Sequence, residues 1–200
     1  MHTNLSQLPT NLPVPVDDGA AAHLEGARLP RIVLPSTDGT TVNLADLEGR
    51  WVLYIYPMTG RPDMPLPDGW DAIPGARGCT PQSCSFRDHY NELMELRTGV
   101  FGLSAQTSAY QREARGRLHL PFQLLGDSSL QLKSTLRLPT FTTAGMELYK
   151  RLTLIGQKGK IRKVFYPVFP PNRNADDVLA WLRADVQSGA AGDAPQASRP

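Results

Sequence analysis

The sequence contains little cysteine: Cys79 and Cys84 are the two cysteines in 200 residues. A small domain cross-linked by several disulfides is therefore excluded, as is a zinc-binding module with four cysteine ligands. No segment approaches the roughly 20 apolar residues of a membrane-spanning helix, and the N-terminus lacks the basic flank and apolar core of a secretion signal. We expect a soluble, cytoplasmic protein without membrane contact. In that compartment a lone cysteine pair is more often catalytic, redox-active or metal-binding than a permanent cross-link.

An excess of charge of one sign is also missing. Basic side chains number 21 and acidic ones 19, which gives a net charge of +2, and they are spread along the sequence. Because a phosphate backbone requires a clustered stripe of Lys and Arg, we expect no nucleic-acid partner. With 40% hydrophobic residues, the chain is long enough for one well-packed domain and short for two.

Composition divides the chain into three parts. Residues 1–26 are rich in Pro, Asn and small residues without periodicity, so we predict an arm that lies on the surface or is loosely ordered. Residues 188–200 have a similar composition and are predicted to form a flexible tail. Residues 27–187 form the predicted domain. Within it, residues 58–78 hold many Pro and Gly residues and are predicted to be a long loop.

Apolar runs and helical patterns alternate within the domain. Extended segments are predicted at 31–35 and 37–44 as a hairpin, at 51–57 as a central strand buried on both faces, at 99–105, and at 151–156 with 164–168 as an antiparallel pair. Helices are predicted over 81–97, over 108–118 with Ser108 as N-cap, and over 175–186 with Asn174 as N-cap. The alternation predicts an α/β fold with a mixed central sheet flanked by helices.

The cysteines lie in "GCTPQSC", residues 78–84, where Cys79 stands just before the predicted helix. Unpaired backbone N–H groups and the positive end of the helix dipole favour a thiolate there. Five residues along a helix advance about 7.5 Å and rotate by about 140°, whereas the Cα atoms of a disulfide lie within about 7 Å. A bond between Cys79 and Cys84 is therefore incompatible with an intact helix, and their pairing requires the first turn or two to unwind.

The residues alone leave other interpretations of the pair open. Half of a zinc site would need two further ligands, and His89 with His2, His23 or His119 offers no standard spacing. We therefore expect no metal. Two ordinary buried cysteines without a function remain an alternative, while a static structural disulfide is disfavoured by the helix geometry.

Four segments occur in the order found in peroxiredoxins: "GTTVNLADLEGRWVLYIYP", "GCTPQSCSFRDHYNEL", "GLSAQTSAYQREARGRLHLPFQLLGD" and "KRLTLIGQKGKIRKVFYPV". The sequence resembles the bacterioferritin-comigratory, or Q-type, branch of that family. In this branch the peroxidatic cysteine stands in "GCT" and the resolving cysteine follows before "FRD". The resemblance covers residues 27–186. It implies a thioredoxin-like fold and thiol-dependent reduction of hydrogen peroxide and organic hydroperoxides, and it implies no cofactor.

The resemblance assigns roles to individual residues. Cys79 would be the peroxidatic nucleophile that becomes a sulfenic acid, and Cys84 would resolve it as an intramolecular disulfide. A thioredoxin or glutaredoxin-like protein would reduce that disulfide. Arg151 resembles the family arginine that holds thiolate and peroxide, although counting back from Gly159 places the family position on Lys150. We prefer Arg151 because a guanidinium holds two oxygens in fixed geometry; the alternative is a solvated cation at a strand end.

The sequence departs from the family just before Cys79. The family has a Pro after the strand and a Thr or Ser three residues before the nucleophile. Here Pro57 ends the strand, the inserted residues 58–78 follow, and Ala76 at the expected position has no hydroxyl. Either Thr59 folds back and supplies the hydroxyl, or Thr80 or backbone N–H groups take over. We favour Thr59.

The remaining expectations concern the pocket and the partners. Pro57, Gly78 and Thr80 are expected to line the substrate pocket. The insertion would be either a lid that selects bulkier organic peroxides or a self-packed surface loop. A thioredoxin-like redox sensor that uses the same disulfide as a conformational switch is the alternative function. The sequence leaves open whether the protein is a monomer or a homodimer.

Overall fold

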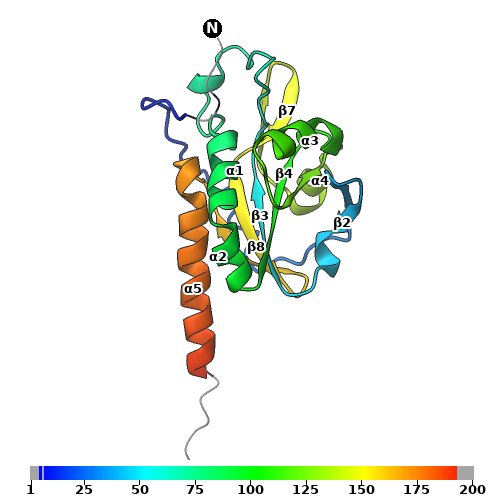
Figure 1. Ribbon diagram of the computed structural model, residues 1–200, viewed down its shortest axis with the longest axis vertical. Coiled ribbons are helices and arrows are strands. Elements are labelled where there is room, and N and C mark those ends of the chain that lie inside the picture. The colour runs from blue at the N-terminus through cyan, green and yellow to red at the C-terminus, as the bar shows by residue number, and fades with distance from the viewer. Residues whose placement is uncertain (1–4, 6, 193–200) are drawn as a thin grey trace, which may run out of the picture.

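The strand β3 (Arg50–Ile55) lies in the middle of a five-stranded sheet in the computed structural model, which describes residue 5 and residues 7–192 (Figure 1). Val52 and Tyr54 are buried in the apolar cluster on one face of the sheet, whereas Trp51 and Leu53 are buried in the cluster on the other face. Successive side chains of a strand point to opposite faces, so a continuous apolar run is buried on both sides. The expected central strand is confirmed.

The sheet is mixed, as predicted. Its order is β5 (Gln123–Gly126), β4 (Thr98–Ser104), β3, β8 (Leu152–Gln157) and β9 (Lys160–Phe165). The strands β3, β4 and β5 are parallel, while β8 and β9 are antiparallel to their neighbours. Two hairpins flank the sheet: β1 (Val33–Pro35) with β2 (Thr41–Asn43), and β6 (Thr140–Thr143) with β7 (Met146–Tyr149).

The helices lie on both faces of the sheet. They are α1 (Cys79–Asp88), α2 (Tyr90–Glu95), α3 (Ser108–Arg117), α4 (Gln131–Leu136) and α5 (Asn174–Gly192). Three short 3-10 turns cover Leu44–Asp46, Trp70–Ala72 and Pro171–Arg173. Figure 1 shows α5 running beside α1 and α2, and residues of all three helices share one apolar cluster. Residues of α4 pack into the cluster on the opposite face.

The single helix predicted over residues 81–97 is corrected to two helices. The backbone of His89, between α1 and α2, leaves the helical region at φ −96° and ψ 9°. The apolar face of the segment consequently changes direction at this residue. Phe86 of α1 and Leu93 of α2 are fully buried, whereas Met94 is 48% exposed.

Two predicted helix caps are also corrected. The N-cap of α3 is Thr107 and not Ser108, because the Thr107 hydroxyl accepts a hydrogen bond from the backbone N–H of Tyr110 at 3.2 Å. Asn174 is the first residue of α5 and not its cap. Its side-chain oxygen accepts a buried hydrogen bond from Gln82 at 2.9 Å instead.

The packed part of the chain extends beyond the predicted limits of 27 and 187. Ala21 and Leu24 of the predicted arm are buried in the core cluster that also contains Trp51 and Leu53. At the other end, α5 continues to Gly192. The rest of the predicted tail, 193–200, and residues 1–4 and 6 of the arm lie outside the described residues. None of the helices that the structure describes is long and apolar enough to span a bilayer.

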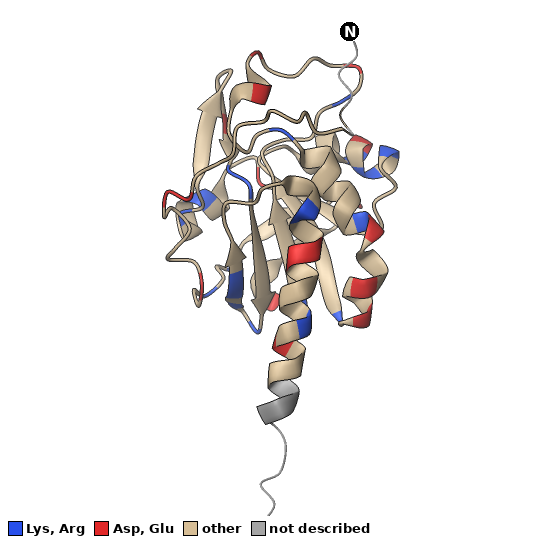
Figure 2. Cartoon of the chain, turned by 90° about the vertical axis from the view of Figure 1, so that its left-hand side faces the viewer, with Lys and Arg blue, Asp and Glu red and all other residues tan. Residues whose placement is uncertain are grey.

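Charged side chains of both signs are interspersed on the described surface. Figure 2 shows blue and red residues interspersed over the cartoon, and the charged residues of α5 are Asp176, Asp177, Arg183 and Asp185. Several of these groups pair, as Arg50 does with Asp185 at 3.4 Å and Arg183 with Glu92 at 2.5 Å. The described part of α5 therefore presents no basic stripe.

Candidate functional site

The first residue of α1 is Cys79, and Gly78 directs the chain into it. Gly78 has a left-handed backbone, with φ 108° and ψ 19°, which glycine adopts at little cost. A Cβ atom there would lie 2.3 Å from Cγ of Pro171 and 2.8 Å from a methyl group of Leu8. Cys79 is thereby fixed at the helix N-terminus and is 5% exposed. The unpaired amide groups of the first turn and the positive end of the helix dipole lie at this position.

Gly78→Ala is expected to lower the free energy of unfolding by about 2–4 kcal/mol, because it combines left-handed strain with overpacking against Pro171. Urea denaturation followed by circular dichroism measures the change. The control is Gly116→Ala in α3, where a Cβ meets nothing within 4 Å; it should be neutral or stabilising by about 0.5–1 kcal/mol. Equal midpoints for Gly78→Ala and the wild type would contradict the steric argument.

Arg151 reaches the sulfur of Cys79 from the residue that precedes β8. It is 3% exposed, and its Nη2 donates to Cys79 Sγ at 3.2 Å. The same nitrogen donates to the carbonyl oxygens of Ala76 and Arg77 at 3.0 and 3.2 Å, and Nε donates to that of Gly75 at 3.1 Å. The Arg151 guanidinium therefore holds the backbone carbonyl groups of the last residues of the insertion close to the sulfur of Cys79. A lysine has too few donors in fixed directions to do this.

The neighbouring cation, Lys150, is engaged elsewhere. Its ammonium group pairs with the carboxylate of Asp18 at 2.6 Å on the surface. Hydrogen bonds from Lys150 and Tyr166 lower the pKa of Asp18 to about 2. The structure thus brings Arg151, the preferred of the two candidates, to Cys79.

Gln82 extends the contacts of Arg151 into the protein interior, and the sequence-based expectations omit it. Its side-chain oxygen accepts a hydrogen bond from Nη1 of Arg151, and its amide nitrogen donates to Asn174. The Asn174 oxygen also accepts from the Thr153 hydroxyl at 2.6 Å. This buried polar chain joins α1 to β8 and α5. A signal was available, because residues three apart share one face of a helix, as Cys79 and Gln82 do.

Cys84 lies further along α1, half-buried against the apolar cluster, and both cysteines are free thiols. Burial raises the pKa of the Cys84 thiol; Arg87 opposes this shift and Asp88 reinforces it. Because α1 is continuous through both cysteines, their sulfur atoms cannot bond in this conformation. The predicted disulfide between Cys79 and Cys84 therefore requires a second conformation of the first turns.

A tyrosine beneath α1 supports the segment between the cysteines. The Tyr54 hydroxyl donates to the Ser83 hydroxyl at 3.1 Å, and its ring stacks on Phe86 with 4.6 Å between centroids. Burial raises the pKa of Tyr54, so it remains a neutral hydrogen-bond donor. Phe86 lies beyond Cys84 and is fully buried. It anchors the C-terminal half of α1 independently of the first turns.

The hydrogen bonds that Thr59 donates go to Gln106 and not to the sulfur of Cys79. The backbone N–H and the hydroxyl of Thr59 both donate to the side-chain oxygen of Gln106, at 2.8 and 3.0 Å. Among the hydrogen bonds of the described residues, those of Cys79 are with Arg151 and with the carbonyl oxygen of Ala76, the latter at 3.7 Å. The position that carries a hydroxyl in the family thus presents a backbone oxygen here. Gln106 was not anticipated from the sequence.

A chamber of about 10 Å³ lies directly on Cys79, which is room for about one water molecule. Of the three residues expected to line a substrate pocket, Gly78 and Thr80 line this chamber, whereas Pro57 is buried two residues after β3 and does not. The inserted residues supply most of the remaining wall: Met58, Gly60, Leu66, Trp70 and Arg77. The insertion also packs against the β6–β7 hairpin through a small cluster of Trp70, Ala76 and Leu148. It therefore both covers the cysteine and is anchored on the hairpin.

The histidines of the discarded zinc interpretation serve other contacts. His89 lies 2.6 Å from Glu92 and 3.4 Å from Asp176, and a ring nitrogen of His23 contacts the Leu136 carbonyl oxygen at 2.8 Å. Within residues 5 and 7–192, no group of three or more His, Cys, Asp and Glu side chains is arranged to hold a metal. His2 lies outside the described residues.

Comparison with known proteins places this geometry in context. The redoxin family model matches residues 24–179. The chloroplastic peroxiredoxin Q of Suaeda salsa is 26% identical over 161 residues, covering 80% of this chain and 68% of that protein. Peroxiredoxin bcp1 of Schizosaccharomyces pombe is 32% identical over 109 residues, covering 54% of this chain and 48% of that protein. The crystal structure of peroxidoxin BcpB from Mycobacterium tuberculosis superposes with a TM-score of 0.66 at 26% identity, covering 81% of this chain and 98% of that one.

Proposed function

Because the chain belongs to the redoxin family and is similar to Q-type peroxiredoxins, we propose that it is a thiol peroxidase that reduces hydrogen peroxide and organic hydroperoxides. The observation that carries the proposal is the contact of 3.2 Å between Nη2 of Arg151 and the sulfur of Cys79 at the N-terminus of α1. A cation and a helix N-terminus at one sulfur stabilise a thiolate. They also stabilise the negative charge that moves onto the leaving oxygen of a peroxide.

In the first step the Cys79 thiolate attacks the terminal oxygen of the hydroperoxide. A sulfur–oxygen bond forms, the oxygen–oxygen bond breaks, and Cys79 becomes a sulfenic acid. The leaving group departs as hydroxide or alkoxide and takes a proton from solvent to give water or an alcohol. Arg151 holds both the thiolate and the peroxide oxygens through charge-assisted hydrogen bonds.

In the second step Cys84 resolves the sulfenic acid. Its sulfur bonds to that of Cys79, one water molecule leaves, and an intramolecular disulfide forms. Burial raises the pKa of Cys84 in the folded helix, and thiolate is the attacking form. Unwinding of the first turns of α1 would expose Cys84 and remove this effect, so the same motion brings the sulfur atoms together and activates the second thiol.

In the third step an external dithiol of the thioredoxin or glutaredoxin type reduces the disulfide by two successive exchanges. The dithiol is oxidised to a disulfide, both cysteines return to thiols, and α1 refolds. In this proposal Cys79 and Cys84 are the redox groups that the protein contributes to the cycle.

Peroxide consumption in the presence of dithiothreitol tests the function. We expect many equivalents of hydrogen peroxide to be consumed per protein. Without reductant, mass spectrometry should show the loss of two hydrogen atoms and a peptide cross-link between Cys79 and Cys84. Consumption of a single equivalent with no turnover would support the redox sensor instead, and no oxidation of either cysteine would exclude both functions.

Cys84→Ser is expected to stop the cycle after its first step. The sulfenic acid on Cys79 should accumulate and react with dimedone, and turnover with thioredoxin should fall on the order of tenfold or more, because the disulfide that thioredoxin reduces cannot form. Ser85→Ala, one residue further along α1, is the matched control and should retain wild-type turnover. Full turnover of Cys84→Ser with thioredoxin would show that thioredoxin reduces the sulfenic acid on Cys79 directly and that Cys84 is not the resolving thiol.

A further inference from the structure

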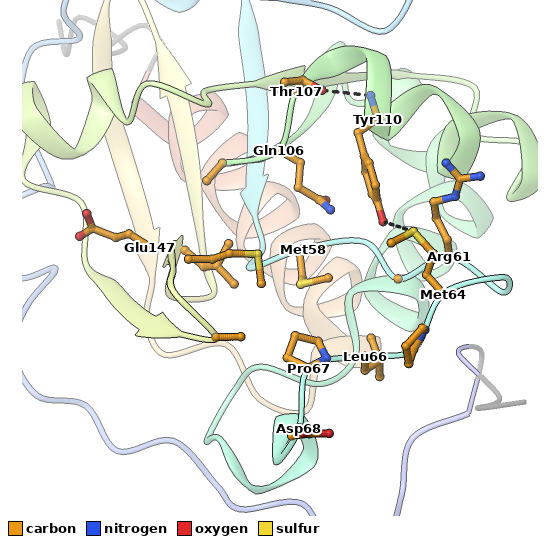
Figure 3. A pocket seen from close by; sticks show the side chains of 16 residues that line it. Met58, Arg61, Met64, Leu66, Pro67, Asp68, Gln106, Thr107, Tyr110 and Glu147 are labelled. Carbon is orange, nitrogen blue, oxygen red and sulfur yellow. Dashed lines mark hydrogen bonds between the residues drawn. The ribbon is translucent and has the colours of Figure 1, made fainter. Parts of the chain in front are cut away.

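A pocket of about 790 Å³ lies beside the chamber on Cys79. The insertion, the turn before α3 and the β6–β7 hairpin form its walls (Figure 3). Figure 3 shows Met58 between Gln106 on one side and the segment of Leu66 and Pro67 on the other. The volume is within the range of about 300–1,000 Å³ that is typical of small-molecule sites.

The pocket and the chamber share a wall. Met58, Gly60 and Leu66 line both of them. The chamber holds about one water molecule and has no space for a carbon substituent. A methionine side chain is unbranched and adapts readily to a ligand. Movement of Met58 would therefore join the sulfur of Cys79 to the larger pocket.

The lining of the pocket is mostly apolar and rich in thioethers. Met58, Met64 and Met146 all face it, together with Leu66, Pro67 and Leu148. Flexible, polarisable side chains of this kind suit apolar ligands of varied shape. Met64 and Met146 are 52% and 38% exposed, so the pocket is open to solvent on their side.

The charged groups of the lining disfavour an anionic ligand. Arg61 is the one cation among the lining residues, and its guanidinium is held by both carboxylate oxygens of Asp63, at 3.0 and 3.1 Å, and lies 5.7 Å from the ring centre of Tyr110. Two carboxylates, Asp68 and Glu147, also line the pocket, and that of Glu147 is paired with Lys133. A carboxylate on the ligand would therefore meet the like charge of Asp68 and a cation, Arg61, that already has an anionic partner.

We propose that this pocket binds the carbon substituent of an uncharged, bulky organic hydroperoxide, whose peroxide group reaches Cys79 past Met58 and Leu66. The assignment rests on the proposed peroxidase function and adds its substrate class. The insertion that replaces the short family connection thus supplies a specificity element, and hydroperoxides that carry a carboxylate on the substituent are poor substrates.

Three hydroperoxides separate the possibilities: hydrogen peroxide, cumene hydroperoxide and its para-carboxylate. Cumene hydroperoxide should have a KM at least about tenfold below that of hydrogen peroxide, and a kcat/KM about tenfold above that of the carboxylate. Equal values for cumene hydroperoxide and its carboxylate would overturn the substrate assignment while leaving the peroxidase function intact. No turnover of any of the three would overturn the peroxidase function and the assignment together.

A charge introduced into the lining should change the preference. Met146→Lys places a cation at the solvent-exposed rim, and the ratio of kcat/KM for the carboxylate to that for cumene hydroperoxide should rise about fivefold. Met94→Lys is the matched control, since Met94 is similarly exposed but lies on α2 and does not line the pocket. An unchanged ratio for Met146→Lys, or an equal rise for Met94→Lys, would argue against the assignment.

Binding is measured without turnover in Cys79→Ser protein labelled with ¹³C at the methionine methyl groups. The ligand is 2-phenyl-2-propanol, the alcohol that reduction of cumene hydroperoxide would release. The resonances of Met58, Met64 and Met146 should shift on titration, and that of Met94 should not. Shifts that are absent, or that are as large for Met94, would overturn the pocket assignment.

Discussion

Cys79→Ser is expected to lower hydroperoxide turnover on the order of 10⁴-fold or more, the scale of loss when an essential nucleophile is removed. A serine hydroxyl is a far weaker nucleophile than a cysteine sulfur and cannot become a sulfenic acid. The rate of peroxide consumption at pH 7 with dithiothreitol measures the loss.

The same variant separates chemistry from folding. Serine is close to cysteine in size, and the position is 5% exposed, so the midpoint of urea denaturation should change little. Cys84→Ser is the paired control, because it should still be oxidised once by peroxide. If Cys79→Ser retained that single oxidation and Cys84→Ser lost it, the roles of the two cysteines would be exchanged.

Arg151→Met is expected to lower kcat/KM for hydrogen peroxide about 10²–10³-fold, because it removes the cation that stabilises charge on the sulfur and on the leaving oxygen. It also leaves the Gln82 side chain and the carbonyl oxygens of the insertion without their donor, so stability should fall as well. Turnover is therefore normalised to the folded fraction, measured by circular dichroism at the assay temperature.

Two further variants isolate the cause of this loss. Lys150→Met, at the adjacent residue whose ammonium pairs with Asp18, should retain turnover within about twofold, as expected for a surface ion pair. Arg151→Lys keeps the charge and loses the planar fork, so its turnover should lie between those of Arg151→Met and the wild type. A greater loss of turnover in Lys150→Met than in Arg151→Met would show that Arg151 is not the cation that acts at the sulfur.

The fold was predictable from the sequence where the apolar pattern is long. The run at residues 51–57 and the repeat through Phe86 and Leu93 carry enough side chains to define a buried strand and a helical face. The strand β5, the strands of the β6–β7 hairpin and α4 have four to six residues each and escaped prediction. The shorter strands β1 and β2 were predictable because Asp38-Gly39 marks the turn between them. The break at His89 carries no proline or glycine to mark it.

Two parts of the candidate site were predictable from the sequence. The cysteines lie in a recognisable local motif, and Arg151 lies at the start of a predicted strand. The partners that come from distant parts of the chain were not predictable. Asn174 is 92 residues from Gln82, and Gln106 is 47 residues from Thr59. The chamber wall likewise depends on how the insertion packs on Leu148. Tertiary packing of this kind leaves no periodic trace in a single sequence.

The place of Gln82 between the two cysteines has a kinetic consequence. Any rearrangement that joins the sulfur atoms of Cys79 and Cys84 also carries Gln82 away from Arg151 and Asn174. The disulfide form then lacks both the free nucleophile and the arrangement that holds Arg151. Hydroperoxide and reductant must consequently take turns, and initial rates measured against both substrates should give the parallel double-reciprocal lines of a ping-pong reaction.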